Sequence, residues 1–242
     1  MFGRTLRIYR KGFIWTTALL CLMMAVAGLL NPIMALIEPL LAEEEIVLPA
    51  RPDTLTLMMR CGLVYELAGA LYAASLGMRT LRRDAKPGAL MWNLPVSRAQ
   101  IVLRHYAAGA LYVILLAVLV GAVSFGVLIA SGSAGIGAIV PLMHPAIGFL
   151  AAYSLVFGLA SIINNVAVLG AAAMLVPVVL ILPTCAMLLK AFSTFMLPAE
   201  LALFLPYGPM GSLQIKTLVG AALAIVLPLV VSLGVYSRRS LI

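Results

Sequence analysis

Long apolar stretches alternate with short polar ones along the whole chain. Each apolar stretch reaches about 20 residues with few charges, which is enough for a helix to cross a hydrocarbon layer roughly 30 Å thick. The alternation typical of barrel strands is absent, so helices are the expected way to satisfy lipid-exposed backbone. The pattern predicts an all-α membrane protein, one transmembrane domain over 1–242, with six transmembrane helices at about 13–37, 57–78, 107–131, 146–166, 167–189 and 217–236.

The first twelve residues have a pattern of their own. On a helix they place basic side chains on one face and apolar side chains on the other, Arg4, Arg7 and Arg10 against Phe2, Leu6 and Tyr9. This favours an N-terminal amphipathic helix over 1–12, lying on the membrane, over a plain basic flank. A basic start before an apolar run also imitates a signal peptide. The run continues to Ile37, however, which makes it long enough to span.

The region 190–216 is apolar but broken by prolines and glycines. Each of its apolar pieces has about half the length needed to cross the bilayer. Short apolar helices with proline breaks are typical of re-entrant or interfacial segments, which we expect here before the last span. Two further crossings are the competing interpretation.

Charge adds an orientation to this picture. Only 10% of the residues are charged and the net charge is +8, whereas soluble domains have roughly a quarter of charged residues. We therefore interpret Lys and Arg as topology signals and contacts for anionic membrane lipid, not for nucleic acid. With the N-terminus inside, twelve basic residues lie inside and three outside. This predicts a multi-pass protein of the bacterial plasma (inner) membrane with both termini cytosolic.

The segment 79–106 is the longest cytosolic one by this topology. Lys86-Pro87-Gly88 predicts a turn, a short apolar piece follows, and Pro95 interrupts the backbone. Ser97 and Gln100 have the spacing of a capping box, and Val96 and Ile101 that of a hydrophobic staple. A helix is therefore expected to start at Arg98 and to continue into the third span. At about 1.5 Å per residue it would be about 51 Å long and project from the membrane.

This segment resembles the first cytosolic loop of type-2 ABC transporter permeases, in Asp84-Ala85-Lys86-Pro87-Gly88 followed by Leu94-Pro95-Val96-Ser97-Arg98. Here Asp84 stands alone among basic residues, where the family often has a glutamate-rich stretch. The resemblance implies a cytosolic coupling helix that docks on a separate ABC ATPase subunit, which binds ATP and Mg. It also implies a second permease subunit, identical or related. The implied ATPase-coupling residues are Leu90, Trp92, Leu94, Pro95, Val96, Ser97 and Arg98.

Motifs for chemistry within this chain are absent. There is no G-x-x-x-x-G-K-[ST] phosphate loop, no H-E-x-x-H and no G-x-S-x-G. The three cysteines lie within apolar runs without paired spacing, which favours core packing over a disulfide or a metal site. We therefore expect no catalytic residue, no metal and no cofactor bound by this chain.

Two charges fall within the second predicted span, Glu66 near its middle and Arg60 about one turn inside its outer end. An ionisable group in a membrane is costly and is a candidate functional group. The two are separated by six residues, about 120° from a shared helical face, so they are no obvious pair. Two roles are open for Glu66, an interhelical hydrogen bond or a contact with substrate on a translocation path.

These features favour the membrane subunit of an ATP-driven ABC exporter. A membrane assembly or immunity protein that binds a partner without transport is the alternative of a different class. A secondary carrier is a third, although the inverted repeats of many carriers are not evident here. The sequence leaves the substrate open.

Overall fold

A computed structural model of the chain describes residues 2–42, 54–82, 97–131, 139–189 and 215–238. These residues form six helices and no strand, and every helix contains or overlaps one of the predicted spans. The helices are α1 (Phe2–Ala42), α2 (Thr54–Arg82), α3 (Arg98–Ala130), α4 (Ile139–Ile162), α5 (Val166–Leu189) and α7 (Ile215–Arg238). The all-helical fold class is thus confirmed.

Four of these helices are long and apolar enough to cross a membrane. The qualifying stretches are Arg10–Leu30 of α1, Ala99–Ala130 of α3, Pro145–Ile162 of α4 and Val219–Tyr236 of α7. Helix α5 has a shorter apolar stretch, Val166–Leu180. Many large apolar side chains on these helices point outward, such as Leu19, Leu119 and Leu227. Crossing of the membrane by α2 and α5, and so the full count of six spans, stays a prediction.

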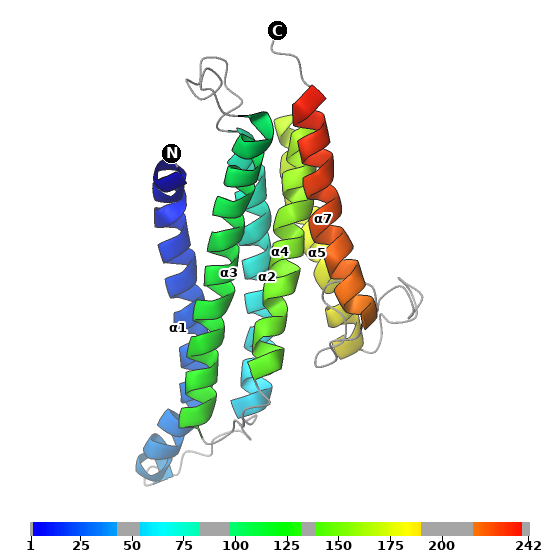
Figure 1. The fold of residues 1–242 in the computed structure, drawn as a ribbon. Helices are drawn as coiled ribbons and strands as arrows, with labels where there is room; N and C mark the ends of the chain where they lie inside the picture. Colours follow the sequence, from blue (N-terminus) through cyan, green and yellow to red (C-terminus); the bar gives the residue numbers. More distant parts are fainter. Residues whose placement is uncertain (1, 43–53, 83–96, 132–138, 190–214, 239–242) are drawn as a thin grey trace.

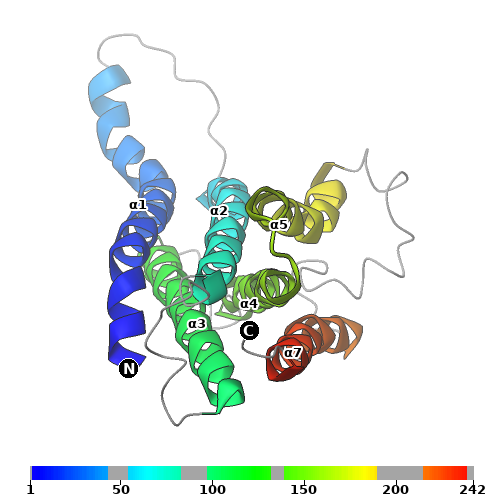
Figure 2. The same cartoon turned by 90° about the horizontal axis from the view of Figure 1, so that it is seen from above.

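The helices run alternately up and down, so the start of α1, the start of α3 and the end of α7 lie at the same end of the bundle (Figure 1). Seen from that end, α1 lies on one side, α5 and α7 lie on the other, and α2, α3 and α4 lie between them (Figure 2). The placement of both chain termini on one face of the membrane stays a prediction. Which face is cytosolic stays a prediction.

The core lies around α4, which packs against α2, α3, α5 and α7. Tyr153, Val156 and Phe157 of α4 have no exposed surface. Glycines let the neighbouring helices approach closely. A Cβ at Gly77 of α2 would lie 2.6 Å from the Tyr153 carbonyl oxygen, and one at Gly158 of α4 would lie 2.6 Å from Pro228 Cβ of α7. Such small-residue contacts are a main source of helix association in membranes.

The structure differs from the expectation at the N-terminus. No turn separates a surface helix over 1–12 from the first span, because α1 is continuous from Phe2 to Ala42. Gly12 is the nearest weak point, and a lone glycine lowers helix stability by only about 1 kcal/mol. The amphipathic pattern therefore belongs to the first turns of a longer helix.

The connection between α4 and α5 agrees with the sequence. A tight turn is predicted at Asn164-Asn165, and α4 ends at Ile162 while α5 begins at Val166. Asn165 Oδ1 accepts a hydrogen bond from the Ala167 N–H at 2.9 Å, which is a helix N-cap. α4 itself begins earlier than expected, at Ile139, and includes Pro145.

Two predicted features lie wholly or partly outside the described residues. Of the re-entrant region 190–216, only the last two residues are described, and they belong to α7. Of the coupling segment 79–106, the ends are described as parts of α2 and α3, and the residues between Arg82 and Ser97 are not.

Candidate functional site

The start of α3 has the predicted cap. Ser97 has an extended backbone, with φ −63° and ψ 143°, and its side chain accepts a hydrogen bond from the Gln100 N–H at 3.3 Å. The Ser97 carbonyl accepts the first helical bond, from the Ile101 N–H at 3.2 Å. The helix then runs for 33 residues without a break, about 50 Å at about 1.5 Å per residue.

The predicted coupling residues divide at this cap. Ser97 is exposed and Arg98 is the first residue of α3. The remaining five, Leu90, Trp92, Leu94, Pro95 and Val96, lie outside the described residues. The structure thus describes the beginning of the long helix. The break at Pro95 that the sequence predicts before it, which we call the elbow, lies outside the described residues.

A hydrogen-bonded link joins α3 to α4 two turns beyond the cap. The Tyr106 hydroxyl lies 2.7 Å from Ser154 Oγ. Ser154 donates to the Leu150 carbonyl at 2.7 Å, so Tyr106 is the donor to Ser154. In return, the Tyr153 hydroxyl donates to the Tyr106 carbonyl at 3.1 Å. One hydrogen bond from α3 to α4 and one from α4 to α3 thus hold the N-terminal part of α3 against the most buried part of α4.

Aromatic packing reinforces this link. The Tyr106 ring centroid lies 5.4 Å from that of Tyr153 and 5.3 Å from that of Phe157, and the Tyr106 and Phe157 rings pack edge-to-face. Tyr153 fits over Gly109 of α3, where an added Cβ would lie 2.3 Å from the tyrosine hydroxyl. Such aromatic pairs contribute about 0.5–1.5 kcal/mol beyond their burial. We call Tyr106, Gly109, Tyr153, Ser154 and Phe157 the α3–α4 clamp.

Sequence reasoning missed the clamp. Its hydrogen bonds join residues 47 or 48 positions apart, and local patterns carry no information on such pairs. The available signal was modest, a tyrosine and a serine inside two apolar runs, where polar groups need partners.

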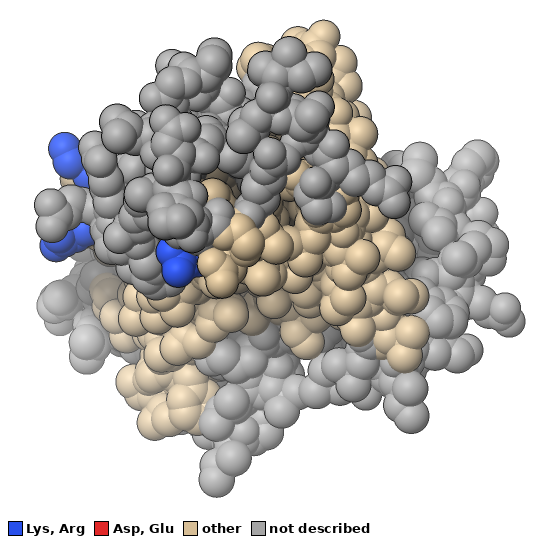
Figure 3. Space-filling view, turned by 45° about the horizontal axis from the view of Figure 1, so that its top comes forward, with Lys and Arg blue, Asp and Glu red and all other residues tan. Residues whose placement is uncertain are grey.

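Basic side chains gather at the end of the bundle where α3 begins. Among the residues whose exposure the structure describes, Arg10, Lys11, Arg79 and Arg104 are exposed at this end. In the space-filling view the visible Lys and Arg atoms lie on one side of this end, and none of the described atoms in view belongs to Asp or Glu (Figure 3). The positive surface is suited to anionic lipid headgroups or an acidic partner surface.

Glu66 is buried in the bundle, with 3% of its surface exposed. It shares a helical face with Gly69 and Gly77, which pack against Phe149 and the Tyr153–Phe157 turn of α4. Its Oε2 has no hydrogen-bond partner within the described part of the chain. Arg60 belongs to α2, but its side chain lies outside the description, so the expected lack of pairing stays untested.

The described residues contain no group of three or more His, Cys, Asp or Glu side chains that could hold a metal ion. Comparisons of the chain with protein families, with curated proteins and with solved structures find no match in any of the three.

Proposed function

We propose that this protein is the membrane-spanning permease subunit of an ATP-driven ABC exporter of type-2 architecture. In this proposal a separate ABC ATPase binds and hydrolyses ATP with Mg. This chain and a second permease subunit, identical or related, form the path through the bacterial plasma membrane. The end that carries the start of α3 and both chain ends faces the cytosol.

One observation carries the proposal most directly: the capped start of α3 is continuous with a long helix that is clamped to the core. Ser97 fixes the first turn, and Tyr106, about 14 Å further along the helix axis, is bonded to Ser154 of α4. A displacement of the residues before Ser97 would therefore be transmitted to α4, because continuous helix joins Ser97 to the Tyr106–Ser154 hydrogen bond. The residues Leu90 to Arg98 would receive that force from the ATPase.

The remainder of α4 would distribute the movement. It packs against α2 at Gly77 and against α7 at Gly158, where no room is left for a side chain between the helices. Displacement of the α3 start would thus shift α4 together with α2 and α7. Packed helices of this kind tend to switch between discrete arrangements, as alternating access requires.

Co-purification tests the proposal. The permease is expressed in turn with each ABC ATPase of its source organism, beginning with any encoded near its gene, and is purified through a tag on the permease. We expect the ATPase to co-purify, and Arg98→Glu or a Pro95→Ala/Leu94→Ala pair to reduce the recovered ATPase at least tenfold. Arg10→Glu at the same end of the bundle is the matched charge control and should leave the recovery unchanged.

Two results would contradict the proposal. The first is a permease that purifies alone at full yield with every ABC ATPase of its source organism. The second is an equal loss of ATPase with Arg98→Glu and with Arg10→Glu, since this would indicate a general electrostatic contact and not docking at the elbow. Each variant is checked for monodispersity, so that misfolding is not taken for loss of docking.

A further inference from the structure

Several buried oxygen atoms in the bundle have no hydrogen-bond partner within the described residues. They are Thr17 Oγ1, Tyr65 OH, Glu66 Oε2 and Tyr72 OH. Thr17, Tyr65 and Glu66 are 8%, 4% and 3% exposed. A buried polar group without a partner costs about 1–3 kcal/mol. Buried polar atoms of this kind are the setting in which internal water is held, since a water needs two to four polar partners.

Two of these hydroxyls lie on one face of α2. Tyr65, Tyr72 and Arg79 follow one another at intervals of seven residues, about 10 Å along the helix axis. The Tyr72 hydroxyl is within electrostatic reach of Arg79 and of Tyr112 on α3. The Tyr65 hydroxyl is within electrostatic reach of Cys21 on α1. The Tyr65 ring also packs edge-to-face on Phe149 of α4, with the ring centroids 5.2 Å apart. This face of α2 therefore lies among α1, α3 and α4.

Thr17 of α1 lies between the levels of the two tyrosines. The Phe13 ring packs 4.9 Å from the Tyr112 ring, which places Phe13 near the level of Tyr72. Cys21 is within electrostatic reach of the Tyr65 hydroxyl, so it lies near the level of Tyr65 along the bundle. Thr17 is four residues from both Phe13 and Cys21, so its hydroxyl lies midway. We call Thr17, Tyr65 and Tyr72 the polar seam.

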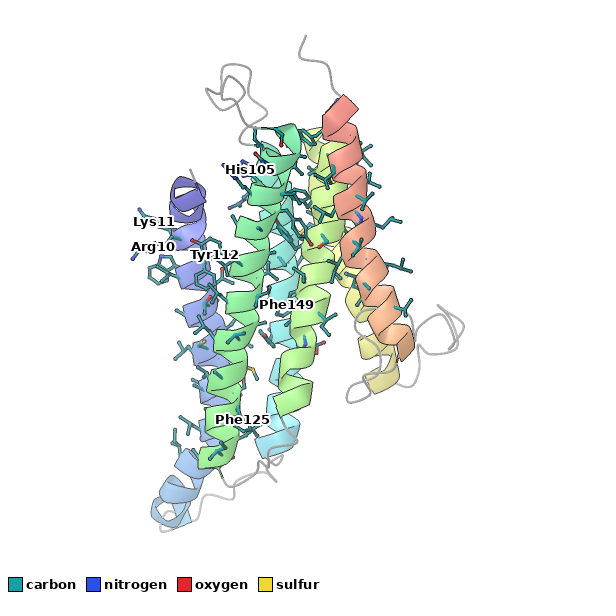
Figure 4. All side chains as sticks on the ribbon, in the orientation of Figure 1. Arg10, Lys11, His105, Tyr112, Phe125 and Phe149 are labelled. Atoms are coloured by element: carbon teal, nitrogen blue, oxygen red, sulfur yellow. The ribbon has the colours of Figure 1, made fainter. Side chains whose placement is uncertain are left out.

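The seam has an exposed end and a buried end. At the exposed end are Arg79 and Arg10, and Tyr112 is within electrostatic reach of Arg10. Figure 4 shows Arg10 and Tyr112 at a similar height on α1 and α3. At the buried end the Tyr65 hydroxyl is within electrostatic reach of the Glu66 carboxyl. Polar side chains thus occur at successive levels of the bundle between the exposed end and the buried acid.

We propose that Glu66 is a proton-binding site, reached from the Arg10 and Arg79 end through water held in the polar seam. A hydronium ion at the exposed end gives up a proton, which passes along hydrogen bonds of water and hydroxyls. It forms the O–H bond of the Glu66 carboxyl, and water remains at the surface. The step is a proton transfer without redox change. It stands apart from the coupling proposed above and would hold for a protein without an ATPase partner.

The surroundings favour a proton over a metal cation as the ligand. A buried carboxylate without a partner is far less stable than the neutral acid, and the described residues hold no group of three or more His, Cys, Asp or Glu side chains that could bind a metal ion. The helices packed on α2 supply few other titratable groups to Glu66. The titratable group near α2 is Cys21 on α1 and Tyr112 on α3. In the described stretch Pro145–Ile162 of α4 it is Tyr153, whose hydroxyl donates a hydrogen bond to α3. The stretch Val166–Leu180 of α5 offers none.

Infrared spectroscopy of the full-length protein in lipid nanodiscs tests the proposal. A protonated buried carboxyl has a carbonyl stretching band that moves when its proton is exchanged for deuterium. We expect one such band that Glu66→Gln removes and that shifts within minutes in deuterated buffer. Tyr65→Phe, Tyr72→Phe and Thr17→Val should keep the band and slow the exchange at least tenfold.

Tyr106→Phe is the matched control, because it removes a tyrosine hydroxyl outside the seam, and it should leave the exchange rate unchanged. The proposal is overturned by a spectrum in which Glu66→Gln removes no band, since Glu66 is then ionised, for example on a metal cation. A wild-type band that stays unexchanged for hours also overturns it, as does equal slowing by Tyr65→Phe and Tyr106→Phe. If one seam variant does not fold, the other two still decide whether the exchange depends on the seam.

Discussion

At the scale of single residues, the closest contacts in the bundle depend on glycine. Gly77 is the clearest case, because the atoms opposite it are backbone atoms of α4 that cannot rotate away. At Gly109 the opposing atom is the tip of the Tyr153 side chain, which also holds the α3–α4 clamp. Helix propensity alone would favour alanine at both positions. Packing, and not helix formation, therefore explains these glycines.

Gly77→Ala is expected to destabilise the folded protein by about 1–3 kcal/mol, because its Cβ would overlap the Tyr153 carbonyl oxygen and force α2 and α4 apart. Gly126→Ala is the matched control. Nothing lies within 4 Å of an added Cβ there, so it should be neutral or stabilising by up to about 1 kcal/mol. Unfolding in detergent measures both. Equal effects of the two changes would contradict the packing argument.

At the scale of elements, α3 combines a start that local sequence defines with contacts that local sequence does not. Its cap was predictable because Ser97 and Gln100 are three residues apart and the bond between them is a local one. The clamp was not, because Tyr106 and Ser154 meet only once α3 and α4 pack. The continuous α1 was mispredicted for a related reason. Amphipathic spacing reports which faces are polar, but not where a helix bends.

Removal of the cap tests the role of Ser97. Ser97→Ala leaves the Gln100 N–H without its side-chain acceptor, and we expect a loss of about 1 kcal/mol in the stability of the first turn. Hydrogen exchange of the amides at 99–101 should speed up about fivefold. Ser97→Asp retains an acceptor and should exchange like the wild type. Unchanged exchange in Ser97→Ala would show that the cap does not hold the helix start.

At the scale of the whole molecule, the alternating helices place the start of α3 at the same end of the bundle as the start of α1 and the end of α7 (Figure 1). The α3–α4 clamp then ties this end to the centre, where α4 packs on α2, α3, α5 and α7. A displacement of the α3 start would thus be transmitted to most of the bundle through α4. The polar seam runs beside this path, between α1 and α2, and uses residues outside the clamp.

The central claim is that α3 moves as one rigid body from its capped start. The most direct test is a distance measured by electron paramagnetic resonance between spin labels at Ala99 and Ile129, both exposed, in a chain whose three native cysteines are replaced. Thirty residues of helix predict about 45 Å between the backbone positions. We expect one narrow distribution near this value, unchanged when the ABC ATPase and ATP are added. A broad or two-peaked distribution, or a shift of more than about 5 Å with ATP, would show a hinge within α3 and contradict the account.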